Sequence, residues 1–169
     1  FNPRNLENID LNNYNIQGLL SGEKRLKEIA RKKLFSNWKT NKLKNDVLIT
    51  NGAKAALYCV FKSITNKKNS NIGIINPNWP TYIDLINLCN AKPLFFNTYY
   101  EKNFDIDISS LEVFVKKNKL RLLVLSSPNN PCGKIYDKKT ITSLIRICSS
   151  NKCYLVIDES FSSLIFQKK

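Results

Sequence analysis

Polar side chains follow two apolar runs near the end of the chain, and their types suit the binding of a ligand. Asn130 follows the run at residues 122–125, and Asp158 directly follows the run at residues 154–157. Side chains at the carboxyl ends of parallel strands face the crevice in which open α/β sheets bind ligands. An amide there can hydrogen-bond a ligand oxygen. A carboxylate there needs a partner, because burying it unpaired is costly; a protonated heterocyclic nitrogen, a helix cap or a salt bridge would each supply one.

A turn that contains glycine, earlier in the chain, fits the pattern of a phosphate-binding site. Gly52 lies between a short β-rich run at residues 47–50 and a helical pattern that starts at Ala53. Amides at the start of a helix bind phosphate through their hydrogen atoms and the helix dipole. Lys54 adds a positive charge. The same sequence is also compatible with an ordinary corner between a strand and a helix.

An aromatic side chain follows the next apolar run, at residues 72–75. Trp79 lies between two prolines, Pro77 and Pro80, which restrict the backbone around it. Its indole could stack on a planar ring, a contact that contributes roughly 0.5–1.5 kcal/mol beyond burial, or it could fill the core. The bonds that precede Pro77 and Pro131 are candidates for cis peptides, which occur almost only before proline.

Helical and strand-like patterns alternate along the chain, with short connections between them. Such alternation predicts an α/β fold with three layers, α/β/α, in which a mostly parallel sheet is covered by helices on both faces. The predicted helices are residues 21–34, 53–64, 81–88, 109–117 and 138–149, and the predicted strands are residues 47–50, 72–75, 93–96, 122–125 and 154–157.

Four segments, taken in order, resemble successive landmarks of class I/II aminotransferases, which are pyridoxal-phosphate enzymes of the aspartate aminotransferase fold type. The resemblance implies an N-terminal lead-in segment at residues 1–20 and a partial cofactor-binding large domain at residues 21–169. That domain is truncated before the Schiff-base lysine of the family, so we expect a longer polypeptide. The segments are Asn51-Gly52-Ala53, Pro77-Asn78-Trp79-Pro80-Thr81-Tyr82, Asn129-Asn130-Pro131-Cys132-Gly133 and Asp158-Glu159-Ser160-Phe161.

The resemblance implies that residues in the first half of the chain bind the phosphate and one face of the cofactor. Gly52, Ala53 and Lys54 would cradle the phosphate of pyridoxal 5'-phosphate. Trp79 would stack on the pyridine ring. The resemblance also suggests that Tyr14 reaches the phosphate site of a partner subunit.

The second half of the chain would contact the edge of the ring. Asn130 would hydrogen-bond the phenolic oxygen, and Asp158, the expected catalytic residue, would pair with the ring nitrogen and keep it protonated. Phe161 stands where family members often have tyrosine. Because Phe161 has no hydroxyl group, it cannot contact the phenolic oxygen as that tyrosine does.

The implied activity is the transfer of an amino group between an amino acid and a 2-keto acid, in a cytoplasmic homodimer. Two alternatives stay open. Phenylalanine at position 161 also occurs in relatives that decarboxylate amino-acid phosphates. Lys168 and Lys169 lie too close to Asp158 to serve as the cofactor lysine, so a non-catalytic fragment or remnant of the fold is the other alternative.

Composition argues against other classes of function. The net charge of +14 comes largely from lysines that are scattered along the chain, whereas readers of nucleic acid cluster their basic residues and often use arginine. We therefore expect no nucleic-acid partner. No apolar run is long enough to span a membrane, and no signal segment opens the chain.

The cysteines and the lack of histidine limit the catalytic mechanisms and metal sites that this chain can provide. With no histidine among these residues, nucleophile schemes that pair histidine with serine or cysteine are excluded within this chain. The five cysteines are irregularly spaced, so we expect no metal site. Cys59, Cys89 and Cys148 fall within or at the end of predicted helices, where we expect small buried hydrophobic side chains.

Overall fold

The structure is a computed structural model that describes residues 21–35, 47–65 and 70–165. The chain divides into two compact units, residues 1–50 and residues 51–169. The predicted lead-in at residues 1–20, with Tyr14, lies outside the described residues. Within the described segments, no helix is both long and apolar enough to cross a membrane.

The first unit contains helix α1, Lys24–Phe35, which confirms the predicted helix. The carboxylate of Glu23 accepts hydrogen bonds from the backbone amides of Arg25 and Leu26, at 2.9 and 2.7 Å, and so caps the start of the helix.

The prediction of a strand at residues 47–50 is wrong. These residues form no strand in the structure. The amide of Ile49 donates instead to the carbonyl of Ser21, at 3.1 Å. Gly22 allows this close approach, because a Cβ at that position would lie 2.6 Å from the side chain of Ile49. The β-rich run therefore packs against the start of α1 rather than joining a sheet.

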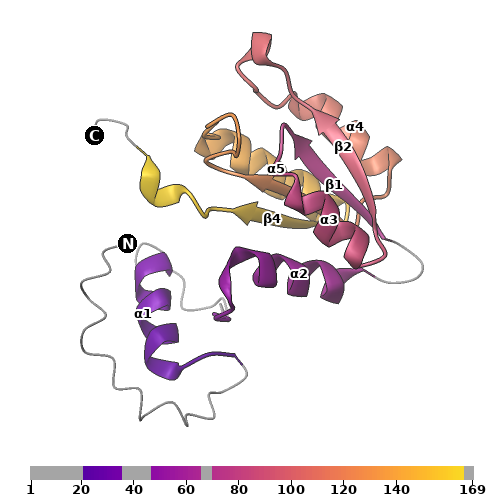
Figure 1. The fold of residues 1–169 in the computed structure, drawn as a ribbon. Coiled ribbons are helices and arrows are strands. Elements are labelled where there is room, and N and C mark those ends of the chain that lie inside the picture. The colour runs from indigo at the N-terminus through magenta and orange to yellow at the C-terminus, as the bar shows by residue number, and fades with distance from the viewer. Residues whose placement is uncertain (1–20, 36–46, 66–69, 166–169) are drawn as a thin grey trace. The chain divides into compact units, whose positions relative to one another are not determined.

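The second unit is built on a sheet of four parallel strands in the order β2-β1-β3-β4 (Figure 1). The chain runs from β1 outward to β2, and then returns to place β3 and β4 on the other side of β1. The strand order therefore reverses between β1 and β3, and this is the point at which open α/β sheets bind ligands. The strands are β1 Asn71–Asn76, β2 Lys92–Asn97, β3 Leu122–Ser126 and β4 Tyr154–Asp158.

Two helices pack on each face of the sheet, as the three-layer prediction requires. Ile72 and Ile74 of β1 pack in one core cluster with α2 and α3, whereas Ile75 packs with α4 and α5 in the other. Neighbouring residues of β3 alternate in the same way, because successive side chains of a strand point to opposite faces. The helices are α2 Gly52–Ile64, α3 Thr81–Leu88, α4 Ile108–Lys117 and α5 Lys138–Ser150.

The α/β fold and the helices and strands predicted from residue 53 onward are confirmed, and their ends differ from the prediction by single residues. One prediction about the cysteines is wrong. Cys89 and Cys148 are buried, but Cys59 is exposed, because it lies on the side of α2 opposite to the residues that pack on the sheet, Leu57 and Phe61.

Candidate functional site

A cavity of about 170 Å³ lies at the carboxyl ends of β1, β3 and β4. It brings together five of the residues that the sequence singled out, although they come from four separate segments of the second unit. Gly52 and Lys54 do not line it. The lining residues are Ala53, Trp79, Tyr82, Ser126, Asn130, Asp158, Ser160 and Phe161.

The topology of the sheet explains why these segments meet. Trp79 lies in the turn between β1 and α3, and Asn130 lies in the loop that follows β3. Asp158 is the last residue of β4 and pairs in register with Ser126, the last residue of β3. The cavity therefore lies beside the reversal of strand order between β1 and β3, where side chains from several strand ends converge.

The carboxylate of Asp158 has three donors within the protein. Its Oδ2 accepts a hydrogen bond from the hydroxyl of Tyr82 at 2.9 Å. Its Oδ1 accepts from the amide of Ser160 at 3.0 Å and from the hydroxyl of Ser160 at 2.6 Å. Asp158 is half-buried, so its need for a partner does not by itself require a ligand. A carboxylate offers about four lone-pair sites, and these three bonds leave room for one further donor in the cavity.

Tyr82 is a functional candidate that the sequence did not reveal. Its side chain is buried, with 1% exposed, and its ring meets the ring of Trp79 edge to face at 5.7 Å between centroids. Burial, and then the charge of Asp158, raise the pKa of Tyr82. The phenol therefore stays protonated and continues to donate to Asp158 throughout the neutral pH range.

Trp79 forms one wall of the cavity and also contacts the predicted phosphate turn. The Nζ atom of Lys54 lies 5.5 Å from the centroid of the indole, a distance typical of a cation–π contact. The start of α2 is thereby held near the aromatic wall, and Ala53 at that start lines the cavity.

Gly52 adopts a conformation that favours glycine. Its φ angle is +78°, in the left-handed region, and a Cβ at this position would meet nothing within 4 Å. Glycine is thus required here by backbone conformation rather than by lack of space. The residue opens α2, and the side chain of Asn51, which precedes the helix, makes no capping hydrogen bond.

The loop that follows β3 is held in place by Asn129, another residue that the sequence analysis did not assign. Its side chain is buried and donates to the carbonyl of Pro77 at 3.0 Å, so it ties this loop to the loop that carries Trp79. The backbone amide of Asn130 donates to the hydroxyl of Ser126 at 3.1 Å. The bonds that precede Pro77 and Pro131 are cis, as expected, and so is the bond that precedes Pro128, which the sequence analysis did not suggest.

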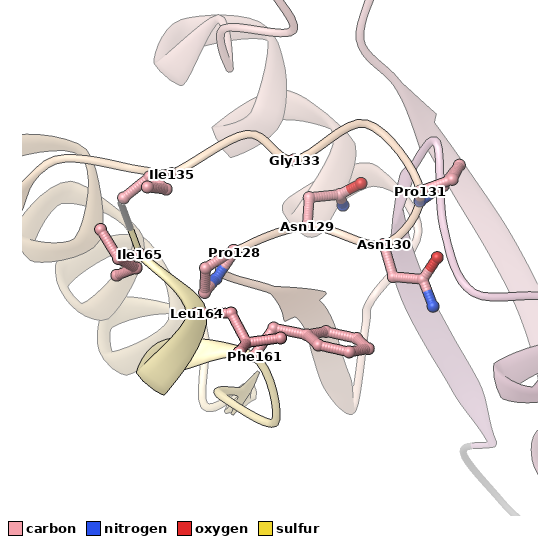
Figure 2. Close-up of a pocket in the computed structure, with 9 residues that line it drawn as sticks. All are labelled: Pro128, Asn129, Asn130, Pro131, Gly133, Ile135, Phe161, Leu164 and Ile165. Carbon is pink, nitrogen blue, oxygen red and sulfur yellow. The ribbon is translucent and has the colours of Figure 1, made fainter. Parts of the chain in front are cut away.

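A second, wider pocket of about 510 Å³ adjoins the cavity, and Asn130 and Phe161 line both. Figure 2 shows the loop at residues 128–135 on one side of this pocket, with Phe161, Leu164 and Ile165 on the other. Its remaining side chains are mostly apolar. Phe161 and Asn130 therefore lie at the boundary that the two pockets share.

The chemistry of the first cavity fits the ring of pyridoxal phosphate. An indole wall suits a flat ring, the open lone pair of Asp158 suits a protonated ring nitrogen, and the amide of Asn130 suits an oxygen on the ring edge. Because these groups line one cavity, a single planar ligand can meet all of them.

Comparison with known proteins assigns the chain to a family. The model of the family described as aminotransferase class I and II matches residues 4–169, so the chain belongs to this family. Its members depend on pyridoxal phosphate.

Individual relatives agree with this assignment. The chain is 28% identical over 141 residues to an aspartate aminotransferase of Thermotoga maritima, covering 83% of this chain and 37% of that protein. It is 30% identical over 123 residues to an asparagine–oxo-acid transaminase of Streptococcus mutans, covering 73% and 31%.

The fold also matches solved structures. The aspartate aminotransferase of Thermus thermophilus, solved with maleate, aligns with a TM-score of 0.80 at 24% identity, over 90% of this chain and 39% of that one. That identity supports the fold alone. The chain spans between about a third and two fifths of the length of these relatives.

Proposed function

We propose that the protein carrying this chain is a pyridoxal-phosphate-dependent aminotransferase, which moves an amino group between an amino acid and a 2-keto acid. The observation that carries the proposal is the single cavity lined by Trp79, Asn130 and Asp158 at the reversal of strand order. Family membership supports it. The relatives reported above are named as transaminases, which favours amino transfer over the decarboxylation that Phe161 had left open.

The ring of the cofactor would lie between the described side chains. Trp79 would stack on one face, Asn130 would donate to the phenolic oxygen, and Asp158 would accept a hydrogen bond from the ring nitrogen. The cofactor, when bound, supplies an electron sink for the α-carbon of the substrate. The part of Asp158 is to keep the ring nitrogen protonated, because a positive ring withdraws electrons more strongly.

Hydrogen-bond donors around Asp158 orient its carboxylate for pairing with the ring nitrogen. Tyr82 and Ser160 hold both carboxylate oxygens in place, so the orientation of the group is set before a ligand arrives. The phosphate of the cofactor would lie at the start of α2, near Gly52, Ala53 and Lys54. Lys54 would supply charge there while it remains against the indole of Trp79.

Phe161 sets this chain apart from family members that carry tyrosine. A phenyl ring at this position gives the phenolic oxygen of the cofactor one donor fewer. We propose that Asn130 is then the main donor to that oxygen from the described part of the chain. The proposal includes a homodimer in the cytoplasm, as the family resemblance implies.

The activity is tested with the full-length protein. The protein is loaded with pyridoxal phosphate and supplied with aspartate and 2-oxoglutarate, and then with other amino-acid donors. We expect one donor to yield its 2-keto acid together with an equal amount of glutamate. Release of carbon dioxide without a keto acid would show a decarboxylase. A loaded protein that turns over no amino donor at all would contradict the proposal.

A further inference from the structure

The carboxyl end of α5 places two cysteines at positions whose side chains meet. The amide of Cys153 donates to the carbonyl of Cys148 at 2.9 Å, and Lys152 between them has a φ angle of +52°. A helix that ends with this bond and a left-handed residue brings the side chains at those two positions into contact. Both cysteines are buried in the same core cluster, at 2% and 7% exposed.

Two other helices end in the same way, but with apolar pairs. The amide of Ala91 donates to the carbonyl of Ile86 after α3, and the amide of Leu120 donates to the carbonyl of Val115 after α4, both at 3.1 Å. Ordinary hydrophobic contacts are sufficient to close those ends. The end of α5 differs because both contact positions carry a cysteine. A thiol can be oxidised as well as packed, whereas the apolar pairs can only pack.

The two thiols interact directly. The thiol of Cys153 donates a 3.4 Å hydrogen bond to the carbonyl of Tyr154, and its interaction with the sulfur of Cys148 lowers the pKa of Cys148 and raises the pKa of Cys153. Because the thiolate is the reactive form of cysteine, Cys148 is the sulfur that reacts first, and Cys153 is next to it.

We propose that Cys148 and Cys153 are a modification site, at which hydrogen peroxide forms a reversible intramolecular disulfide. The thiolate of Cys148 attacks one peroxide oxygen and becomes a sulfenic acid, and the other oxygen leaves as hydroxide, which takes a proton to form water. The sulfur of Cys153 then attacks the sulfur of Cys148. The S–S bond forms, the sulfenic oxygen leaves as a second water, and the two thiols have together lost two protons and two electrons.

The consequence for the fold is a covalent link between the end of α5 and the start of β4. Strand β4 begins at Tyr154, directly after Cys153, and ends at Asp158 in the cavity. The other cysteines lie elsewhere: Cys59 is exposed on α2, Cys89 is buried at the end of α3, and Cys132 lies in the loop after β3.

The sequence allows a direct test, because trypsin cuts after Lys152, between the two cysteines. The full chain is treated with hydrogen peroxide while folded, its remaining thiols are alkylated under denaturing conditions, and the digest is analysed by mass spectrometry without reduction. We expect the peptides 147–152 and 153–168 to appear as one linked species, lighter than their sum by two hydrogens, and to separate after treatment with dithiothreitol.

Two variants complete the experiment. Cys153→Ala should abolish the linked species, whereas Cys89→Ala, which removes another buried thiol, should leave its yield unchanged. Recovery of both peptides with alkylated cysteines after peroxide treatment would overturn the proposal. So would a linked species that forms only when the protein is denatured before oxidation.

Discussion

The hydroxyl of Tyr82 donates a 2.9 Å hydrogen bond to Oδ2 of Asp158, although 76 positions separate the two residues in the chain. The bond joins the first turn of α3 to the end of β4, across the cavity. It fixes one oxygen of the carboxylate that we propose to pair with the cofactor, while Ser160 holds the other.

Replacing Tyr82 with phenylalanine removes this donor and keeps the ring. We expect Tyr82→Phe to lower the free energy of unfolding by about 1–2 kcal/mol, because a hydrogen bond to a charged group is lost at a half-buried site. Denaturant unfolding measures the change. Tyr136→Phe is the matched control, since Tyr136 is also buried but its hydroxyl lies 3.5 Å from the carbonyl of Phe104. Equal losses in the two variants would contradict this explanation.

Trp79 is expected to contribute to affinity by stacking. Trp79→Ala in the full-length protein should weaken the binding of pyridoxamine phosphate about 2- to 10-fold, the equivalent of an offset stacking contact. Trp79→Phe keeps a flat ring and should lose less. Isothermal titration measures both affinities. Unchanged affinity in Trp79→Ala would show that the indole serves only to fill the core.

Gly52 is expected to be sensitive to any side chain, despite the open space around it. Gly52→Ala should destabilise the protein by about 1–2 kcal/mol, because an L-residue is strained in the left-handed region. Asparagine tolerates that region better, so Gly52→Asn should cost less. Thermal or denaturant unfolding of the two variants checks the order, and an alanine variant as stable as the parent would refute it.

Two helix caps predict how stability depends on pH. Asp107 and Asp137 accept hydrogen bonds from the backbone amides of Ser110 and Thr140, which lower the pKa of each carboxyl below 3.8. Their stabilising effect is therefore fully present above the unfolded-state pKa of about 4 and is lost as the pH falls through the lower folded-state pKa.

Replacing a capping aspartate with asparagine separates the pH dependence due to the cap from that due to other titrating groups. Asparagine also caps helices but does not titrate, so Asp137→Asn should show a shallower fall in unfolding free energy between about pH 5 and pH 2. Asp107→Asn should do the same, and the two effects should add because the caps lie on separate helices. A pH profile identical to that of the parent in both variants would contradict the assignment.

Much of the fold could be predicted because its signals are local. The run at residues 122–125 is apolar throughout and forms β3, which is buried along its whole length, as parallel strands covered on both faces are. The run at residues 47–50 has the same local character but forms no strand, because whether a strand forms depends on a neighbour that the local pattern does not reveal. The order of the strands also required the structure.

The site was predictable to the extent that its residues follow strands. Asn130 and Asp158 were recognisable because each comes just after an apolar run, and Trp79 because prolines flank it. Tyr82 was not recognisable, since it looks like an ordinary core residue of an amphipathic helix. Its role comes from a contact with a distant strand end, and no local pattern encodes such a contact.

Asp158 itself is expected to matter more for rate than for binding. In the full-length protein, Asp158→Ala should retain some pyridoxal phosphate, because stacking and phosphate contacts remain, but should lose nearly all turnover. The cause is that an unprotonated ring withdraws electrons poorly from the substrate. Absorbance of the bound cofactor and a keto-acid assay separate the two effects. Normal turnover in this variant would refute the role proposed for Asp158.

The central claim is that the carboxylate at position 158 keeps the bound pyridine ring protonated beside the indole of Trp79. The most direct measurement is ¹⁵N NMR of the full-length protein loaded with pyridoxal phosphate that is labelled at the ring nitrogen. We predict the chemical shift of a protonated pyridine in the parent protein at neutral pH, and a shift toward neutral pyridine in Asp158→Asn. The same chemical shift in both proteins, or a neutral nitrogen in the parent, would contradict the account.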